Sequence, residues 1–165
     1  MSTTEKPWRI VVGSDEAGFG YKDQIKALFA KDPRVADVLD VGVKNGEDHT
    51  AYPHVAVKGA RMVAAGQADR GLIICGTGLG MAISANKVPG IRAVTAHDSY
   101  SVERSVLSNN AQILCMGERV VGLELAKKLA LEWLGLHFDP NSSSAPKVAA
   151  IDSYDQQAHA AQDGK

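Results

Sequence analysis

The sequence predicts an α/β fold in which helices cover both faces of a sheet of five parallel strands, a three-layer α/β/α sandwich. Short apolar runs of strand length alternate with stretches of helical periodicity through most of the chain. Strands separated by helices imply right-handed crossovers, and these produce a parallel sheet that is covered on both faces. The 165 residues, 45% of them hydrophobic and 22% charged, suffice for one globular domain with a substantial core.

The first half of the chain contains two expected strands and two expected helices. A short apolar run at 10–13 ends in a glycine, and a helical pattern follows at 21–30. A weaker apolar run at 37–41 predicts the second strand. From 52 to 65 the apolar residues recur at helical spacing, and Gly66 is suited to end that helix.

The second half continues this alternation and ends in a polar tail. The expected elements are strands at 71–75, 91–96 and 111–116, and helices that reach Asn86 or span 100–107 and 120–134. Beyond residue 139 the chain is rich in serine, and a short helical pattern resumes only at 147–157. We therefore expect a single domain at 1–139 and a tail at 140–165. The tail is too short to fold alone and is expected to pack on a partner subunit.

Composition and charge exclude several classes of protein. A net charge of −1 argues against a nucleic-acid-binding protein, which normally carries a marked basic excess. No apolar run approaches the roughly 18 residues that a membrane span needs, and the first residues lack the apolar stretch of a secretory signal. Cys75 and Cys115 each lie in an apolar run and fit a reducing compartment better than a disulfide framework. The expected location is the cytoplasm.

Polar residues follow several of the expected strands. Because ligands of a parallel sheet bind at the carboxyl ends of its strands, these residues should gather along one edge. They are 13–16, Cys75 with its glycine loop, His97-Asp98 and 117–119.

Cys75 ends a strand and opens the loop Gly76-Thr77-Gly78-Leu79-Gly80. Glycines let backbone N–H groups approach a ligand closely, and the N-terminus of the helix that follows favours negative charge. In such surroundings a cysteine is accessible as a thiolate near neutral pH. A base beside a cradle for an anion is the minimum equipment for making and holding an enolate, so the pattern indicates an enzyme site.

The glycine loop has a competing interpretation as a dinucleotide-binding fingerprint. Asp98 lies at a suitable distance downstream, but the loop lacks the third glycine at the usual place and follows the third strand rather than the first. A thiol has no role in that scheme, so the anion cradle is preferred. Cys75 could also be a plain buried residue, the role assigned to Cys115, which no glycine loop follows. The lack of a C-x-x-C pattern disfavours a thiol redox enzyme.

Three more residues are candidates for the site. The carboxylate of Asp15 either orients a substrate hydroxyl or only caps the next helix. His97 at a strand end is, among the five histidines, the best candidate for acid–base chemistry. Asn109 belongs to a turn before a strand, and its amide could bind a hydroxyl.

Six segments in collinear order carry a resemblance to a known family. They are Gly13-Ser14-Asp15-x-Ala17-Gly18, Tyr52-Pro53-His54, Cys75-Gly76-Thr77-Gly78-Leu79-Gly80-Met81, Ala85-Asn86-Lys87 with Gly90-Ile91-Arg92-Ala93, Ser108-Asn109-Asn110-Ala111, and Gly117-Glu118-Arg119-Val120-Val121-Gly122. In this set the chain resembles the ribose-5-phosphate isomerase B family, which includes galactose-6-phosphate isomerase subunits. The resemblance implies a Rossmann-like sandwich, a metal-free homodimer or dimer of dimers, and a site completed by the neighbouring subunit.

The resemblance also implies roles for the candidate residues. Cys75 would be the base that moves a proton between C1 and C2 of an open-chain sugar phosphate through a cis-enediolate, with no cofactor. The loop Gly76, Thr77, Gly78, Leu79 and Gly80 would hold the enediolate oxygens, because preorganised donors stabilise charge that develops on oxygen. Asp15 and Asn109 would contact sugar hydroxyls, and Arg119 would contact the phosphate.

Three departures from the family pattern bear on the substrate. Ser108 stands where a histidine usually opens the furanose ring, and Glu16 replaces another common histidine. In the tail only Lys147 keeps a charge where two basic phosphate ligands, usually arginines, are expected. Like unit charges about 4 Å apart repel by roughly 4 kcal/mol at an effective dielectric constant of about 20. Glu16 must therefore face a hydroxyl, pair with a cation or point away from a phosphate.

These departures are coherent for a substrate that never cyclises. A four-carbon sugar phosphorylated on O4 has no free hydroxyl with which to close a furanose. The segments 95–104 and 107–113 are also similar to the erythrulose-4-phosphate isomerase branch. We therefore favour erythrose and erythrulose 4-phosphate over ribose 5-phosphate as substrates, with His97 as an auxiliary acid. The alternative is a catalytically silent sugar-phosphate or nucleotide-binding module.

Overall fold

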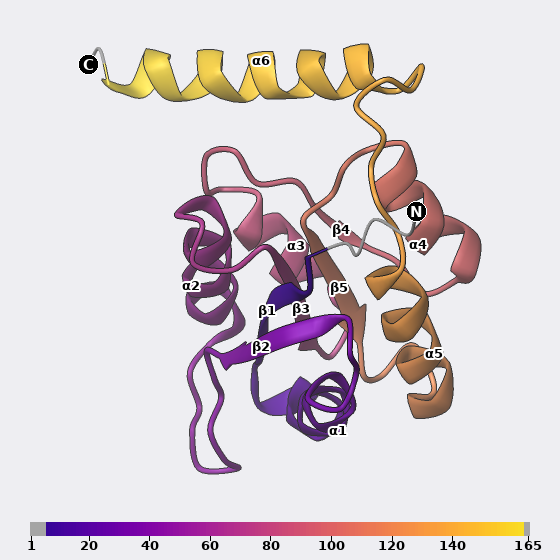
Figure 1. Cartoon of the computed structure of the whole chain (residues 1–165). Helices are drawn as coiled ribbons and strands as arrows, with labels where there is room; N and C mark the ends of the chain where they lie inside the picture. The colour runs from indigo at the N-terminus through magenta and orange to yellow at the C-terminus, as the bar shows by residue number, and fades with distance from the viewer. Residues whose placement is uncertain (1–5, 164–165) are drawn as a thin grey trace.

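The computed structural model describes residues 6–163, so the first five residues of the expected domain and the last two of the tail lie outside it. Its core is a sheet of five parallel strands in the order β2-β1-β3-β5-β4 (Figure 1). The strands are β1 (Trp8–Ser14), β2 (Val35–Asp40), β3 (Arg70–Cys75), β4 (Ala93–Thr95) and β5 (Ile113–Gly117). The predicted fold class is confirmed.

Helices cover both faces of the sheet, which gives the predicted three layers. The helices of the domain are α1 (Phe19–Phe29), α2 (Tyr52–Ala64), α3 (Leu79–Ala85), α4 (Ser99–Leu107) and α5 (Leu123–Leu134). On one face α1, α4 and α5 bury side chains such as Phe29 and Trp133 against the strands. On the other face α2 and α3 pack against a cluster that includes Cys75 and Cys115.

Strands β4 and β5 and helix α5 begin later than the sequence predicts, β5 at Ile113 rather than 111. β4 begins at Ala93 rather than 91, because the backbone N–H of Arg92 donates to the side chain of Gln112 instead of to a neighbouring strand. α5 begins at Leu123 rather than 120, because the N–H groups of Val120 and Val121 both donate to the Gly117 carbonyl in a tight turn.

The tail forms one long helix, α6 (Ala145–Asp163), well beyond the expected 147–157. Figure 1 shows it in yellow, set apart from the body of the molecule. It is held by an ion pair of 2.6 Å between Asp152 and Arg92 and by a bond of 2.6 Å from the Gly90 N–H to Asp155. Gly90 and Arg92 precede β4, so α6 lies at the amino edge of the sheet. Between residues 6 and 163, no helix has the length and apolar character to cross a bilayer.

Candidate active site

Four strand ends that the sequence marked as polar lie side by side along the carboxyl edge of the sheet. Asp15 follows β1, Cys75 ends β3, Gly117 ends β5 and His97 follows β4. Strands β1, β3, β5 and β4 are successive neighbours, and Cys75 is in register with Gly117. The expectation that these strand ends share one rim is confirmed.

The thiol of Cys75 receives a hydrogen bond from its own loop. Its Sγ accepts from the backbone N–H of Gly78 at 3.0 Å, and the residue is 5% exposed. Gly78 has φ +80°, and a Cβ at this position would approach the carbonyl carbon of Met116 to 2.9 Å. Glycine is therefore required for the loop conformation that points this N–H at the sulfur.

The loop after β5 is hydrogen-bonded to the loop after β3. The backbone N–H groups of Glu118 and Arg119 donate to the carbonyls of Cys75 and Gly76 at 2.9 and 3.0 Å. A Cβ on Gly117 would lie 2.5 Å from the Cα of Thr77, so the two loops touch at backbone distance. The Arg119 side chain lies against Gly76, where an added Cβ would be 3.3 Å from its Nη1. A guanidinium and the glycine loop thus share one surface.

The remaining loop residues face outward. Thr77 and Leu79 are exposed, and the Thr77 Oγ1 accepts from the Leu79 N–H at 3.3 Å. The ring of Tyr52, at the start of α2, covers Gly80 so closely that an added Cβ would be 2.4 Å away. Sequence reasoning gave Tyr52 no role; its contact with a loop 28 residues away appears only in three dimensions.

Asp15 and Glu16 occupy the start of a short 3-10 helix, η1 (Glu16–Gly18), that the sequence did not predict. The Oδ1 of Asp15 accepts from the Gly18 N–H at 3.1 Å, which is the capping role weighed for it. The carboxylate of Glu16 contacts His49 Nδ1 at 2.8 Å. Glu16 thus faces an imidazole from the loop that follows β2. No local signal in the sequence marks the pairing of Glu16 with His49.

His97 is bonded to the rim through one ring nitrogen. Its Nε2 accepts the backbone N–H of Gly117 at 2.8 Å. Burial lowers the pKa of His97 and outweighs the opposite effect of the Asp98 carboxylate. The imidazole is therefore neutral, with its proton on Nδ1.

Cys115 is a plain buried residue, as the sequence predicts. It is completely buried in β5, and burial raises the pKa of its thiol, with a smaller contribution from Cys75. Within the described part of the chain, no group of three or more His, Cys, Asp or Glu side chains could hold a metal ion.

Asn109 and Lys147 lie at the opposite edge of the sheet from Cys75. Asn109 lies between α4 and β5 and lines a pocket of about 530 Å³ with Arg92 and with Asp152 of α6. Lys147 is an exposed residue in the first turn of α6. A single chain does not bring these two residues to the thiol.

Comparison with known proteins decides the family. The family model described as Ribose/Galactose Isomerase matches residues 10–151. The chain belongs to the ribose/galactose isomerase family. The predicted family, and with it a sugar-phosphate isomerase of the aldose–ketose class, is confirmed.

Several members of the ribose/galactose isomerase family are similar over nearly their whole length. D-erythrulose-4-phosphate isomerase 2 of Mycolicibacterium smegmatis is 65% identical over 147 residues, 89% of this chain and 97% of that protein. Ribose-5-phosphate isomerase B of Escherichia coli is 41% identical, covering 90% and 97% of the two chains. The solved structure of ribose-5-phosphate isomerase B from Clostridium thermocellum is 41% identical, with a TM-score of 0.84, and covers 91% of this chain and 99% of that one.

Proposed function

We propose that this isomerase interconverts a short aldose phosphate and its ketose through a cis-enediolate, with Cys75 as the base. The observation that carries the proposal is the hydrogen bond from the Gly78 N–H to the Cys75 sulfur at the head of the glycine loop. This bond holds the sulfur at the head of the loop whose backbone donors would stabilise the charged oxygens of the substrate. No cofactor is needed, because the reaction moves protons only.

The chemical step balances within the substrate and one base. The thiolate takes the proton from C2 of the aldose, the C–H electron pair forms the C1–C2 double bond, and negative charge passes to O1. The proton is returned at C1 while the hydroxyl proton on O2 passes to O1, which leaves the carbonyl at C2. Loop donors from Gly76 to Gly80 would stabilise the charged oxygens, with the Thr77 hydroxyl adding one more.

The other site residues receive supporting roles. Asp15 and Glu16 lie at the end of β1 beside β3, where their carboxylates can bind sugar hydroxyls. Arg119, extended over Gly76, is suited to the phosphate. An acid role for His97 would use the proton on Nδ1, because Nε2 is occupied by Gly117.

A four-carbon substrate is supported by two independent observations. Ser108 cannot serve as the acid that a furanose would need for ring opening, and O4-phosphorylated tetroses form no furanose. Two relatives, 65% and 40% identical, are named D-erythrulose-4-phosphate isomerase 2 and D-erythrulose-4-phosphate isomerase.

A second copy of the chain would complete the site. Asn109 and Lys147 lie at the edge away from Cys75, so only a neighbouring subunit can offer them to the same substrate. The exposed apolar side chains of Leu79 and Ile83 on α3 give such a dimer a surface to bury, and α6 is available to pack on the partner. We place the enzyme in the cytoplasm, where its two free cysteines would stay reduced.

A panel of sugar phosphates tests the proposal. We expect kcat/KM for erythrose 4-phosphate and erythrulose 4-phosphate to exceed that for ribose 5-phosphate by at least about tenfold, a transition-state difference of about 1.4 kcal/mol. Equal values would remove the four-carbon preference. Binding without turnover of any four-, five- or six-carbon member would favour a silent sensor instead.

A further inference from the structure

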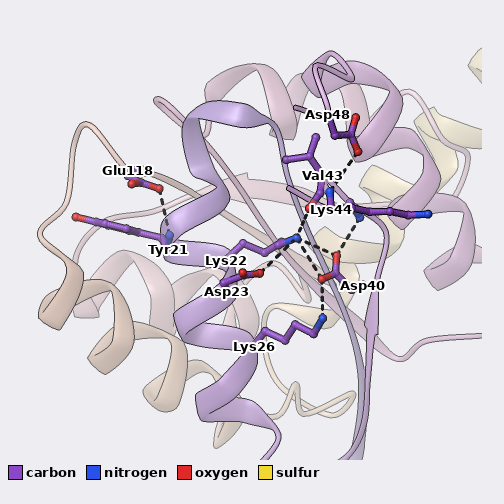
Figure 2. Close-up of polar contacts among 10 residues, drawn as sticks. Tyr21, Lys22, Asp23, Lys26, Asp40, Val43, Lys44, Asp48 and Glu118 are labelled. Carbon is purple, nitrogen blue, oxygen red and sulfur yellow. Dashed lines mark hydrogen bonds and ion pairs between the residues drawn. The ribbon is translucent and has the colours of Figure 1, made fainter. Parts of the chain in front are cut away.

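Lys22 on α1 is a charged side chain buried directly behind the rim. Lys22 is only 1% exposed, because it lies with Ile25 and Phe29 on the buried face of the helix. Burying an ammonium is costly unless it is paired and hydrogen-bonded. The Nζ of Lys22 donates to Asp40 Oδ1 at 3.2 Å and to the Val43 carbonyl, as Figure 2 shows.

The groups that Lys22 binds belong to the loop that leaves β2. Burial would raise the pKa of Asp40, but hydrogen bonds from Lys26, the Gly42 N–H and Lys22 outweigh it, and the pKa is lowered. Asp40 is therefore ionised and makes a charged pair with Lys22. The Val43 carbonyl, three residues further along the same loop, is a second, neutral acceptor for the Lys22 ammonium.

This loop clamps the end of β1, next to the predicted site. The Ser14 N–H donates to the Gly42 carbonyl at 2.6 Å, and the Val43 N–H donates to the Ser14 carbonyl at 2.7 Å. Ser14 is followed at once by Asp15 and Glu16. Fixing Val43 therefore fixes the backbone from which both site carboxylates project.

The same loop carries His49 to the rim. Asp48 braces it by accepting from the Lys44 N–H at 3.2 Å and from the Thr50 hydroxyl at 2.6 Å. His49 then contacts Glu16 at 2.8 Å. Figure 2 shows Lys22, Val43, Lys44 and Asp48 in one connected set of contacts.

Tyr21, the residue before Lys22, bonds the loop after β5 to the same turn of α1. The Tyr21 N–H donates to Glu118 at 3.2 Å, and its hydroxyl donates to the Val121 carbonyl at 3.0 Å. The loop that carries Arg119 and the loop that carries His49 are thus both bonded to the first turn of α1.

We propose that Lys22 is a positioning residue of the isomerase site, which holds the loop 41–51 against β1 so that Asp15, Glu16 and His49 keep fixed places beside Cys75. The inference rests on the proposed function for its kinetic consequence. An apolar residue of the same length would fill the space but release Val43. Displacement of site groups by about 1 Å can cost on the order of 100-fold in rate.

Lys26 offers a matched control for the test. Its Nζ pairs with the same carboxylate, Asp40, at 2.8 Å, but its side chain is 41% exposed and the structure gives it no bond to the loop backbone. Lys22→Met and Lys26→Met each leave Asp40 with one lysine. The two variants therefore differ mainly in whether Val43 is held.

The first readout is kinetic, measured below the Tm of each variant on the sugar phosphate that the wild type turns over best. We expect Lys22→Met to lower kcat at least about tenfold and Lys26→Met to stay within about twofold of the wild type. A lower Tm for Lys22→Met with an unchanged kcat would show a merely structural lysine and overturn the proposal. If Lys22→Met does not fold, Lys22→Leu, which also lacks a donor for Val43, is measured instead, and wild-type kcat in that variant overturns the proposal equally.

The second readout does not depend on activity, so it separates this inference from the proposed function. Deuterium uptake of backbone amides at 41–51 should rise on the order of tenfold in Lys22→Met compared with Lys26→Met, with unchanged uptake in α5. Unchanged uptake at 41–51 overturns the inference even if the enzyme is an isomerase. Faster uptake in a protein that turns over no sugar phosphate would refute the proposed function and retain the loop anchor.

Discussion

The Gly78 N–H and the Cys75 sulfur lie 3.0 Å apart, three residues apart in sequence, with the intervening chain folded into a tight loop. The bond exists because Gly78 adopts φ +80° against the backbone of Met116. The position of the Cys75 sulfur therefore depends on a residue without a side chain. Under the proposed function, backbone conformation and catalytic chemistry are coupled at this one position.

Replacing Gly78 by alanine should uncouple them. We expect Gly78→Ala to lose roughly 1–3 kcal/mol of unfolding free energy through strain at positive φ, and to lose most of its activity because the loop must move away from Met116. Gly66→Ala is the matched control, since Gly66 has φ +70° with nothing within 4 Å of an added Cβ. Urea unfolding and steady-state kinetics on both variants measure the two effects. If Gly78→Ala and Gly66→Ala lost the same stability and both kept full activity, the role assigned to Gly78 would be contradicted.

Much of this site follows from sequence, because its parts are local. Cys75 and its glycine loop are contiguous, and the apolar runs that place strand ends at one rim are read directly along the chain. The family is equally accessible, because six ordered segments carry it. The places of Asp15, Cys75, Gly117 and His97 on neighbouring strands are confirmed.

What sequence did not reveal depends on contacts between distant residues. The pairing of Glu16 with His49 spans 33 residues, and the ring of Tyr52 meets Gly80 only after α2 and α3 pack. The full length of α6 was missed because its polar composition shows little helical periodicity. Lys22 did have a signal: it falls three and seven residues before Ile25 and Phe29, on the apolar face of its helix.

The bond between His97 and Gly117 should make the protein sensitive to mild acid. Burial lowers the pKa of His97 from its ordinary value of 6.5, so the unfolded chain takes up the proton first. Stability is then complete above that value and declines as pH falls through 6.5 toward the lowered pKa. His97→Gln, whose carbonyl oxygen can still accept from Gly117, should show a shallower decline between pH 7 and pH 5 in thermal melts. Parallel curves for the two proteins would contradict this.

The docking of α6 should depend on two aspartates. Asp152 pairs with Arg92 at 2.6 Å, and Asp155 accepts from the Gly90 N–H at 2.6 Å. We expect the double variant Asp152→Asn with Asp155→Asn to take up deuterium faster across α6, while the sheet keeps its protection. Gln157→Ala, which loses only a bond to Ser153 within the helix, is the control. Equal protection of α6 in both variants would mean that other contacts hold the helix.

The most direct test of the central claim follows proton removal from the substrate carbon in heavy water. Wild-type protein should interconvert aldose and ketose phosphate, and Cys75→Ala should slow both interconversion and any deuterium incorporation by about 10²–10⁴-fold, the usual contribution of a general base. Cys115→Ala removes the other buried thiol and should keep the wild-type rate. Wild-type rates in folded Cys75→Ala would contradict the assignment of Cys75 as the base.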